Sequence, residues 1–530
     1  MKKIAIAALT LACASAAASA QSVVDAYNLS QSDLRGTARF MSMAGAFTAL
    51  GGDLSTLNQN PGGIGLFRRH ELGVTVDLNM TGSNVEGEKW NSTHFSCNNF
   101  GYVGAVNTGS DIMPYFQWGV SYGRAMSFDR QYRGGFDNLG TSLTNYIANY
   151  TTQFGYSPTD LGQSTSYNPY YDSAADWLSI LAYNSYMINP TTEGSNKYSG
   201  LFNEGKSSGN ALFDVRERGY VDEYSIAFGG NFADIVYWGM DFGITDLNFT
   251  SETNYDEELA NARIAKSEYS TGGTVNGNAY YNLNNWTNIS GTGFNYKFGL
   301  IVRPIQELRF GVAIHTPTYY KLSTNYDAIV DYSYSTVAAA RAPSAQTSLA
   351  YFDWRLRTPF KFMIGAAGVI GNSAIVSLDY EYSNMRDIRV SSPGGPAYED
   401  ITEDAKLYFK PSNTIRLGLE YRITPKFSAR LGFSTTTSNV EKDVNNGDVQ
   451  VYTSGCNPSY AFTTGTNYIT AGLGYRTGGF SIDFAYVNKH QKSTYRPYTC
   501  YGDDLGWVDS PYVDFTNNSN QLVLSLGYRF

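Results

Sequence analysis

The most constraining feature of the sequence is a strict two-residue alternation of apolar and polar side chains, which is clearest at the C-terminus. Successive side chains of a β-strand point to opposite faces, so this period predicts a strand. One face would carry Leu522, Leu524, Leu526, Tyr528 and Phe530, and the other Gln521, Ser525, Gly527 and Arg529. An apolar face opposite a polar one predicts a strand between lipid and the lumen of a barrel.

The same alternation recurs along the chain in pairs of segments separated by short turns, which predicts antiparallel hairpins. About fourteen strands of roughly ten residues are expected, an even number as single-chain transmembrane barrels have. The predicted fold is therefore all-β, a transmembrane antiparallel β-barrel. Its alternating stretches cover residues 72–80, 100–106, 118–122, 224–228, 238–244, 296–302, 308–314, 360–369, 374–382, 415–421, 427–433, 469–475, 480–486 and 522–530.

The connections between these stretches indicate the orientation of the barrel. Short and long connections alternate, and the longest lies between Phe128 and Asp222. Short turns face the periplasm and long loops face outside, so both chain ends are expected on the periplasmic side. Aromatic residues lie where the short turns begin and end, as in an interfacial girdle. A soluble β-sandwich also alternates, but it would not need outward-facing apolar aromatics on nearly every strand.

Composition supports the same class of protein. Charged residues make up 16% of the chain and aromatic residues 15%, which is fewer charges than usual for soluble domains. The net charge of −9 and the absence of a basic stretch argue against nucleic-acid binding. No linker rich in Pro, Ser or charge separates soluble domains. No nucleophile with a placed base and no zinc-ligand spacing is visible, so neither an enzyme nor a cofactor or metal site is expected.

The first twenty residues predict a cleaved secretory signal peptide. Lys2 and Lys3 precede an apolar run that ends at Ala12, and small residues lead to cleavage before Gln21. Cys13 leaves lipid attachment as the alternative. No stretch of the sequence is long and apolar enough for a transmembrane helix. The expected division is a signal peptide at residues 1–20, a hatch at residues 21–70 and a barrel with long outer loops at residues 71–530.

The segment before the first strand is not strand-like. It contains the Gly- and Ala-rich sequence from Gly36 to Asp53 and continues to the turn Asn60-Pro61-Gly62-Gly63. This stretch resembles the N-terminal hatch of the FadL/TodX family, which has an "AGAFTAL"-type core, an acidic residue shortly after it and an Asn-Pro-Ala-Gly turn. The resemblance covers roughly Gly36 to Gly65, and Gly62 departs from it because the family usually has Ala there. The family barrel also has fourteen strands.

The resemblance implies passive uptake of long-chain fatty acids or other hydrophobic compounds across the outer membrane. A hatch would plug the barrel, and cargo would leave sideways through the wall. The residue types agree, since small residues allow close packing and Asn-Pro-Gly favours a turn. On turn chemistry alone, a plain connector remains an equal alternative. The expected hatch or gate residues are Gly45, Gly51, Gly52, Asn60, Pro61, Gly62 and Gly63.

Inward-facing basic residues are the candidates for binding a carboxylate, because a guanidinium fork matches its geometry. The alternative is that they pair with carboxylates in the wall, for which Asp379, Glu381, Glu420 and Asp483 are available. The expected ligand-binding residues are Arg124, Arg309, Arg416 and Arg430. Arg303 and His315 belong to the same inward-facing set.

Three cysteines remain after cleavage in an oxidising compartment. Cys456 and Cys500 fall in the last two long loops and are the favoured disulfide pair, although Cys97 could also reach the last loop. The expected partners are hydrophobic small molecules such as fatty acids, outer-membrane lipid and the barrel assembly machinery, with the protein itself a monomer. A general porin, which would lack a hatch, and a surface adhesin are the alternative functions. A TonB-dependent receptor is disfavoured because its plug is far larger and its barrel has about 22 strands.

Overall fold

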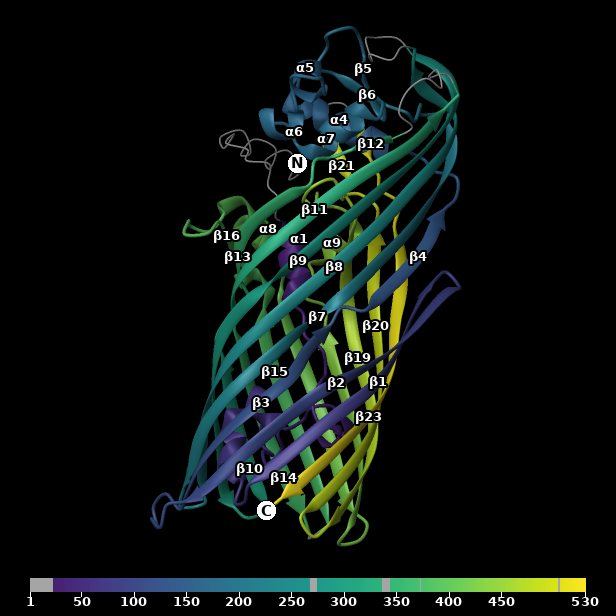
Figure 1. Ribbon diagram of the computed structural model, residues 1–530. Helices are drawn as coiled ribbons and strands as arrows, with labels where there is room; N and C mark the ends of the chain where they lie inside the picture. The colour runs from purple at the N-terminus through teal and green to yellow at the C-terminus, as the bar shows by residue number, and fades with distance from the viewer. Residues whose placement is uncertain (1–21, 267–273, 336–343, 372, 504–505) are drawn as a thin grey trace.

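The computed structural model describes residues 22–266, 274–335, 344–371, 373–503 and 506–530. The predicted signal peptide lies outside these residues. The described chain forms a tall closed barrel with the N-terminal segment inside it and a group of short helices over its upper end (Figure 1). None of the helices in the described ranges is long and apolar enough to span a bilayer.

Fourteen antiparallel strands close the barrel, as predicted. The last strand pairs with the first from Glu71 opposite Arg529 to Val85 opposite Phe515. Several strands are interrupted once, so two elements share one place in the wall. In order the strands are β1 (Glu71–Val85), β2 (Glu88–Asn107), β3 (Tyr115–Ser127) with β4 (Arg130–Phe136), β7 (Ser208–Phe232), β8 (Val236–Ala265), β9 (Thr274–Ile305), β10 (Leu308–His315) with β11 (Tyr319–Tyr334), β13 (Ala350–Arg357) with β14 (Lys361–Ile370), β15 (Ala374–Asn384) with β16 (Arg389–Ser391), β17 (Pro411–Arg422), β18 (Phe427–Thr437), β19 (Tyr460–Thr477), β20 (Phe480–Arg496) and β23 (Val513–Arg529). A short strand, β12 (Ser344–Gln346), pairs with the outer part of β11.

The outer face of the lower barrel is apolar. Leu522, Leu524 and Leu526 are exposed on it, whereas Gln521 and Ser525 of the same strand are buried. Aromatic side chains at the short-turn end are also exposed, as predicted for an interfacial girdle. These include Tyr421, Phe427, Phe480, Tyr528 and Phe530. A closed β-barrel with such a belt is a transmembrane barrel of the bacterial outer membrane.

The strands continue far above this belt, and here the expected strand length of roughly ten residues was wrong. β8 has 30 residues and β9 has 32. Odd-numbered residues of β8 face inward from Tyr237 to Leu259, but they change from polar ones such as Asp241 to apolar ones such as Leu247, Phe249 and Tyr255. The alternation therefore continues while its apolar side changes from the outside to the inside. That change reflects water outside the upper wall and packed protein within it.

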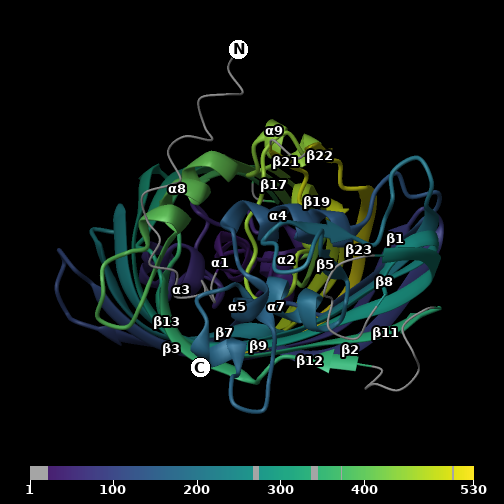
Figure 2. The ribbon, with the colours of Figure 1, turned by 90° about the horizontal axis from the view of Figure 1, so that it is seen from above.

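A cap covers the upper end of the barrel (Figure 2). The connection expected between Phe128 and Asp222 is shorter than predicted, because β4 and β7 take up its two ends. The cap docks through Glu257 of β8, whose carboxylate accepts a hydrogen bond from the backbone N–H of Leu143 at 3.0 Å. Its elements are α4 (Leu143–Phe154), α5 (Pro158–Leu161), α6 (Pro169–Asp172), α7 (Trp177–Asn184), β5 (Ile188–Pro190) and β6 (Tyr198–Gly200). The remaining outer elements are η3 (Met385–Asp387), α8 (Glu399–Tyr408), α9 (Lys442–Asn446), β21 (Tyr501–Asp503) and β22 (Gly506–Val508).

The N-terminal segment runs down the lumen from the outer half. It comprises α1 (Val23–Leu29), α2 (Ala38–Ser42), α3 (Thr56–Gln59) and the 3-10 helix η2 (Pro61–Leu66). Tyr27 of α1 stacks on Phe409 at 4.9 Å, and Ser454 donates a hydrogen bond to Asp25 at 2.6 Å, both partners lying in long outer connections. Phe530 lies at the short-turn end of the barrel (Figure 1), so the prediction that both chain ends lie on the same side is wrong for the first described residues. α1 takes this position because its apolar residues fill the upper lumen.

The three cysteines among the described residues are free, so the favoured pair of Cys456 and Cys500 is not formed. Both are buried, and Cys97 is exposed. Burial raises the pKa of Cys500 to about 11 and also raises the pKa of Cys456. These two thiols are therefore protonated near neutral pH.

Candidate functional site

The hatch, defined as residues 36–67, is fixed to the wall by hydrogen bonds around the barrel. Asp379 accepts from the backbone N–H of Thr48 at 2.7 Å, and Arg309 donates to the carbonyl oxygen of Leu50 at 2.8 Å. Further bonds join Gln117 to Phe67, His315 to Gln59, Thr470 to Ser42 and Ser525 to Ala38. Because the partners come from strands on several sides of the barrel, the hatch is held as a fixed plug.

A buried ionic cluster adds to this attachment. Arg39 of the hatch pairs with Glu420 of β17 at 3.0 Å. Arg430 pairs with the same Glu420 and with Asp483, each at 2.6 Å. Removing one member of such a cluster leaves an uncompensated buried charge, which costs about 3–5 kcal/mol. Arg430 is only 2% exposed and is fully engaged here, so the structure places it away from the cavity described below.

The predicted hatch or gate residues lie where the hatch turns and touches the wall. Gly45, Gly51 and Gly52 have positive φ of 74°, 61° and 66°, a region that favours glycine. A Cβ on Gly62 would lie 2.9 Å from the carbonyl oxygen of Gly299, and one on Gly63 would lie 2.6 Å from Thr56 Oγ1. Pro61 is the first residue of η2, and the side chain of Asn60 caps that helix by accepting from Gly62 N at 3.0 Å.

The wall provides matching space through a set of inward-facing glycines that the sequence reasoning missed. We call this set the glycine ring. A Cβ on Gly311 would overlap the carbonyl oxygen of Thr48, and one on Gly239 would overlap that of Pro61. The ring also contains Gly73, Gly119, Gly229, Gly299, Gly365, Gly418, Gly432 and Gly472, each facing a hatch residue. Glycine at a lumen-facing position of strand after strand is the pattern that could have revealed it.

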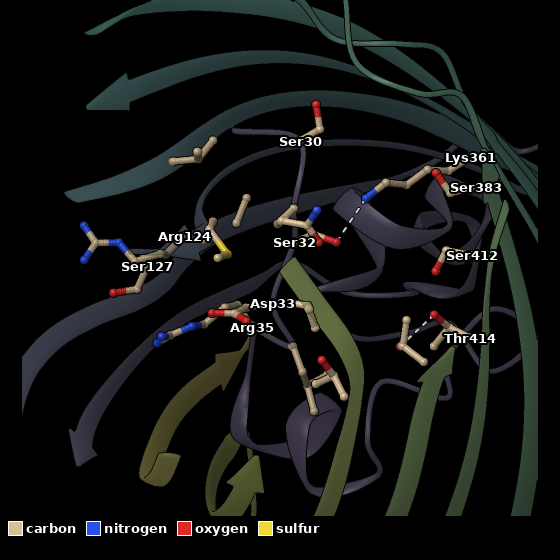
Figure 3. A pocket seen from close by; sticks show the side chains of 18 of the residues that line it. Ser30, Ser32, Asp33, Arg35, Arg124, Ser127, Lys361, Ser383, Ser412 and Thr414 are labelled. Carbon is tan, nitrogen blue, oxygen red and sulfur yellow. Dashed lines mark hydrogen bonds between the residues drawn. The ribbon is translucent and has the colours of Figure 1, made fainter. Parts of the chain in front are cut away.

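Above the hatch lies a cavity of about 360 Å³, a size typical of small-molecule sites. Residues 30–35, which we call the strap, cross it from α1 to the hatch (Figure 3). Asp33 of the strap pairs with Lys489 at 2.6 Å, and Arg35 pairs with Asp77 at 2.9 Å. The strap also donates to the wall from Asp33 N to Ala125 O at 3.2 Å and from Leu34 N to the Tyr468 hydroxyl at 3.4 Å.

The cavity has two chemically different sides, with the strap between them. The apolar face consists of Met126, Phe128, Val221, Phe249 and Tyr320, on or beside β3, β7, β8 and β11. The hydroxyl face, on β15, β17 to β20 and β23, consists of Ser383, Ser412, Thr414, Ser434, Thr436, Thr466, Gln491, Asn517, Ser519 and Gln521. Such a cavity suits a molecule that is apolar at one side and polar at the other.

Only two of the four predicted ligand-binding arginines line the cavity. Arg124 and Arg416 line the cavity, but Arg309 and Arg430 contact the hatch or its cluster instead. Arg124 donates twice to Asp222, at 2.9 and 3.2 Å, and Arg416 donates to Glu381 at 2.5 Å. Lys361 also lines the cavity and was missed. Its Nζ lies 3.2 Å from Ser32 of the strap, and it has no ion pair among the residues the structure describes (Figure 3).

The backbone ladder of the wall breaks beside the apolar face. β2 and β3 pair only from Asn99 opposite Gly123 down to Asn107 opposite Tyr115. Above that point β2 pairs with β1 alone, and β3 pairs with β7 alone. Each strand has a β-bulge where the two separate, at Asn98 and at Ala125. The N-terminal segment contacts both bulges, since Asn98 donates to Gly36 O at 3.3 Å and Asp33 N donates to Ala125 O at 3.2 Å.

Comparison with known proteins identifies the fold. No family model matches the sequence, and no curated protein matches it. Among solved structures, the chain is similar to a FadL homologue of Pseudomonas aeruginosa, with 12% identity, a TM-score of 0.53, and coverage of 94% of this chain and 99% of that one. It also matches the toluene transporters TbuX of Ralstonia pickettii, at 13% identity and a TM-score of 0.47, and TodX of P. putida, at 11% and 0.44, each over 94% of this chain and 99% of the other. The FadL-type fold predicted from the N-terminal segment and the strand count is thereby confirmed.

Proposed function

We propose that this protein, which has the fold of a FadL homologue, is an outer-membrane channel for passive uptake of hydrophobic and amphipathic small molecules such as long-chain fatty acids. The observation that carries the proposal is the cavity, which is closed below by the fixed hatch and bordered at one side by the break in the β2–β3 ladder. Cargo held there cannot continue straight down the lumen. A general porin would need that path to be open.

The position of the apolar face supports lateral release as part of this proposal. Met126 lies one residue beyond the Ala125 bulge, and the cavity lining includes both. An apolar group on this face is therefore next to the only part of the β2–β3 wall that lacks backbone hydrogen bonds. The strap holds the bulge through the bond from Asp33 N to Ala125 O. Cargo that displaces the strap would loosen the wall at that point and pass into the membrane.

A carboxylate head group would meet Lys361 and the cavity-lining Arg416. Arg416 already shares its charge with Glu381, but its Nη1 is buried without a hydrogen-bond partner among the described residues. Arg124 is already paired with Asp222, to which its Nε and Nη2 both donate. We therefore expect Lys361 to contribute more to binding a fatty-acid carboxylate than Arg124 does. The ammonium of Lys361 would gain a carboxylate partner, whereas the guanidinium of Arg124 would have to give up Asp222 to bind the ligand.

Deleting Ala125 should test lateral release. Removing the bulge residue lets β3 continue in regular register with β7, so that its free edge can extend along β2 and close the ladder. Uptake of radiolabelled oleate by cells carrying the variant should fall to the level of cells without the protein, while the amount inserted in the outer membrane is unchanged. Ala125→Gly keeps the bulge and should transport normally. Normal uptake by the deletion variant would argue against a lateral path.

A further inference from the structure

The cap is joined to the wall by a buried acidic residue that the proposed channel function does not use. Glu257 lies on the part of β8 above the apolar belt and is fully buried. One of its carboxyl oxygens accepts from the backbone N–H of Leu143 at 3.0 Å and from the Tyr255 hydroxyl at 2.8 Å. The other lies 2.5 Å from Ser142 Oγ. Glu257 thus holds the N-cap and the first residue of α4, a helix that lies over the upper end of the barrel (Figure 2).

No cation balances the carboxyl group of Glu257. It forms no ion pair with any residue that the structure describes, and the residues opposite it on the neighbouring strands are Ala211 on β7 and Tyr281 on β9. The remaining titratable groups that face it are the phenols of Tyr255 and Tyr498. Burial raises the pKa of all three tyrosines well above the ordinary value, so they are uncharged near neutral pH. Glu257 is therefore the one group in this contact whose charge can change there.

The contacts of Glu257 suit a protonated carboxyl group. A buried carboxylate without a cation loses hydration that hydrogen bonds replace only in part. Burial accordingly raises the pKa of Glu257, although the hydrogen bonds from Ser142 and Leu143 oppose this shift, as does the N-terminus of a helix. In the neutral form one oxygen carries the proton and donates to Ser142 Oγ. The other oxygen still accepts from Leu143 and Tyr255, so no hydrogen bond is lost.

We propose that Glu257 is a proton-controlled latch for the cap, in which the neutral carboxyl group holds α4 on β8. When the group gives its proton to a base in the solvent, the carboxylate that remains is stable only if water reaches it, and the cap loosens. Because docking raises the pKa of Glu257, the stability that this group contributes is complete below the ordinary pKa of a glutamate. It is lost as the pH rises through the raised value. The cap is therefore held more firmly in acid, whatever cargo the channel carries.

Hydrogen–deuterium exchange on the full protein in lipid nanodiscs tests the latch, with the rates corrected for the intrinsic effect of pH on exchange. Protection of the α4 amides should fall by about tenfold or more between about pH 5 and about pH 9, since each unit of pKa shift changes the docking equilibrium tenfold. Glu257→Gln should keep α4 protected over the whole range. Its amide donates to Ser142 and accepts from Leu143 as the neutral carboxyl group does, and it has no proton to lose.

Glu258→Gln provides the matched control. Glu258 is the next residue of β8, but it is exposed on the outward face. This variant should show the pH dependence of the wild type, and protection of the barrel strands should stay constant in every sample. Protection of α4 in the wild type that is constant with pH, or that increases as the pH rises, overturns the inference even if Glu257→Gln does not fold. A folded Glu257→Gln variant in which α4 is unprotected also overturns it. Neither result affects the channel proposal.

Discussion

Deleting residues 21–61 should convert a poorly conducting protein into an open pore. The hatch fills the lower lumen and is bonded to strands around the wall, so the intact protein should show small or rare openings in planar bilayers. A fourteen-strand barrel is wider than the eight-strand barrels that side chains alone can fill. Without its plug it should conduct ions about tenfold or more above the intact protein, a difference set by the width of the lumen.

A shorter deletion separates the hatch from the rest of the N-terminal segment. Removing residues 22–32 takes away α1 and the first half of the strap but leaves the hatch and its wall contacts in place. The shorter variant should conduct as little as the intact protein. Large, steady conductance of the intact protein would instead favour the porin alternative.

Gly311→Val should displace the hatch from its position against the wall. A Cβ at this position overlaps the carbonyl oxygen of Thr48, which is backbone and cannot rotate away. Overpacking of this kind typically costs about 1–3 kcal/mol, and the strand itself favours a β-branched residue. The barrel should therefore still insert and remain heat-modifiable on gels, while its single-channel conductance rises toward that of the hatch deletion.

Gly368→Val is the control for this substitution. Gly368 lies on β14, next to β10, and a Cβ there would meet nothing closer than 4.0 Å. We expect the control to keep both normal insertion and low conductance. Equal behaviour of the two variants would show that the glycine ring does not seat the hatch.

The strands in the membrane could be predicted from the sequence because lipid constrains every second residue. The stretch ending at Phe530 shows this clearly, since its outward positions are apolar and its inward ones, apart from Val523, are polar or glycine. The upper parts of β8 and β9 could not be predicted in the same way. Leu247 and Tyr255 are apolar residues that face inward, so a search for an outward apolar face ends before them.

The site was predictable only in part, for a related reason. Asn60, Pro61 and the hatch glycines have a local turn chemistry that a sequence displays directly. Gly311 and Gly239 are meaningful only because Thr48 and Pro61 lie against them, which depends on contacts between distant segments. The hydroxyl face is equally hidden, because serine and threonine are ordinary in strands until seven of them and three amide side chains share one wall. The sequence predicted which arginines face inward. It could not show which of them already pair with a carboxylate of the wall and which remain able to bind a ligand.

The enclosed N-terminal segment places a constraint on the order of assembly. β1 and β23 close the barrel by joining residues more than 400 positions apart, for example Glu71 and Arg529. α1 lies at the upper end of the lumen. The hatch below it packs so closely against the glycine ring that a Cβ added to one of these glycines would overlap a hatch residue. A finished barrel therefore could not be threaded afterwards by its own N-terminus. The N-terminal segment must therefore already be in place when the wall forms, and pairing of β23 with β1 then closes the barrel around it.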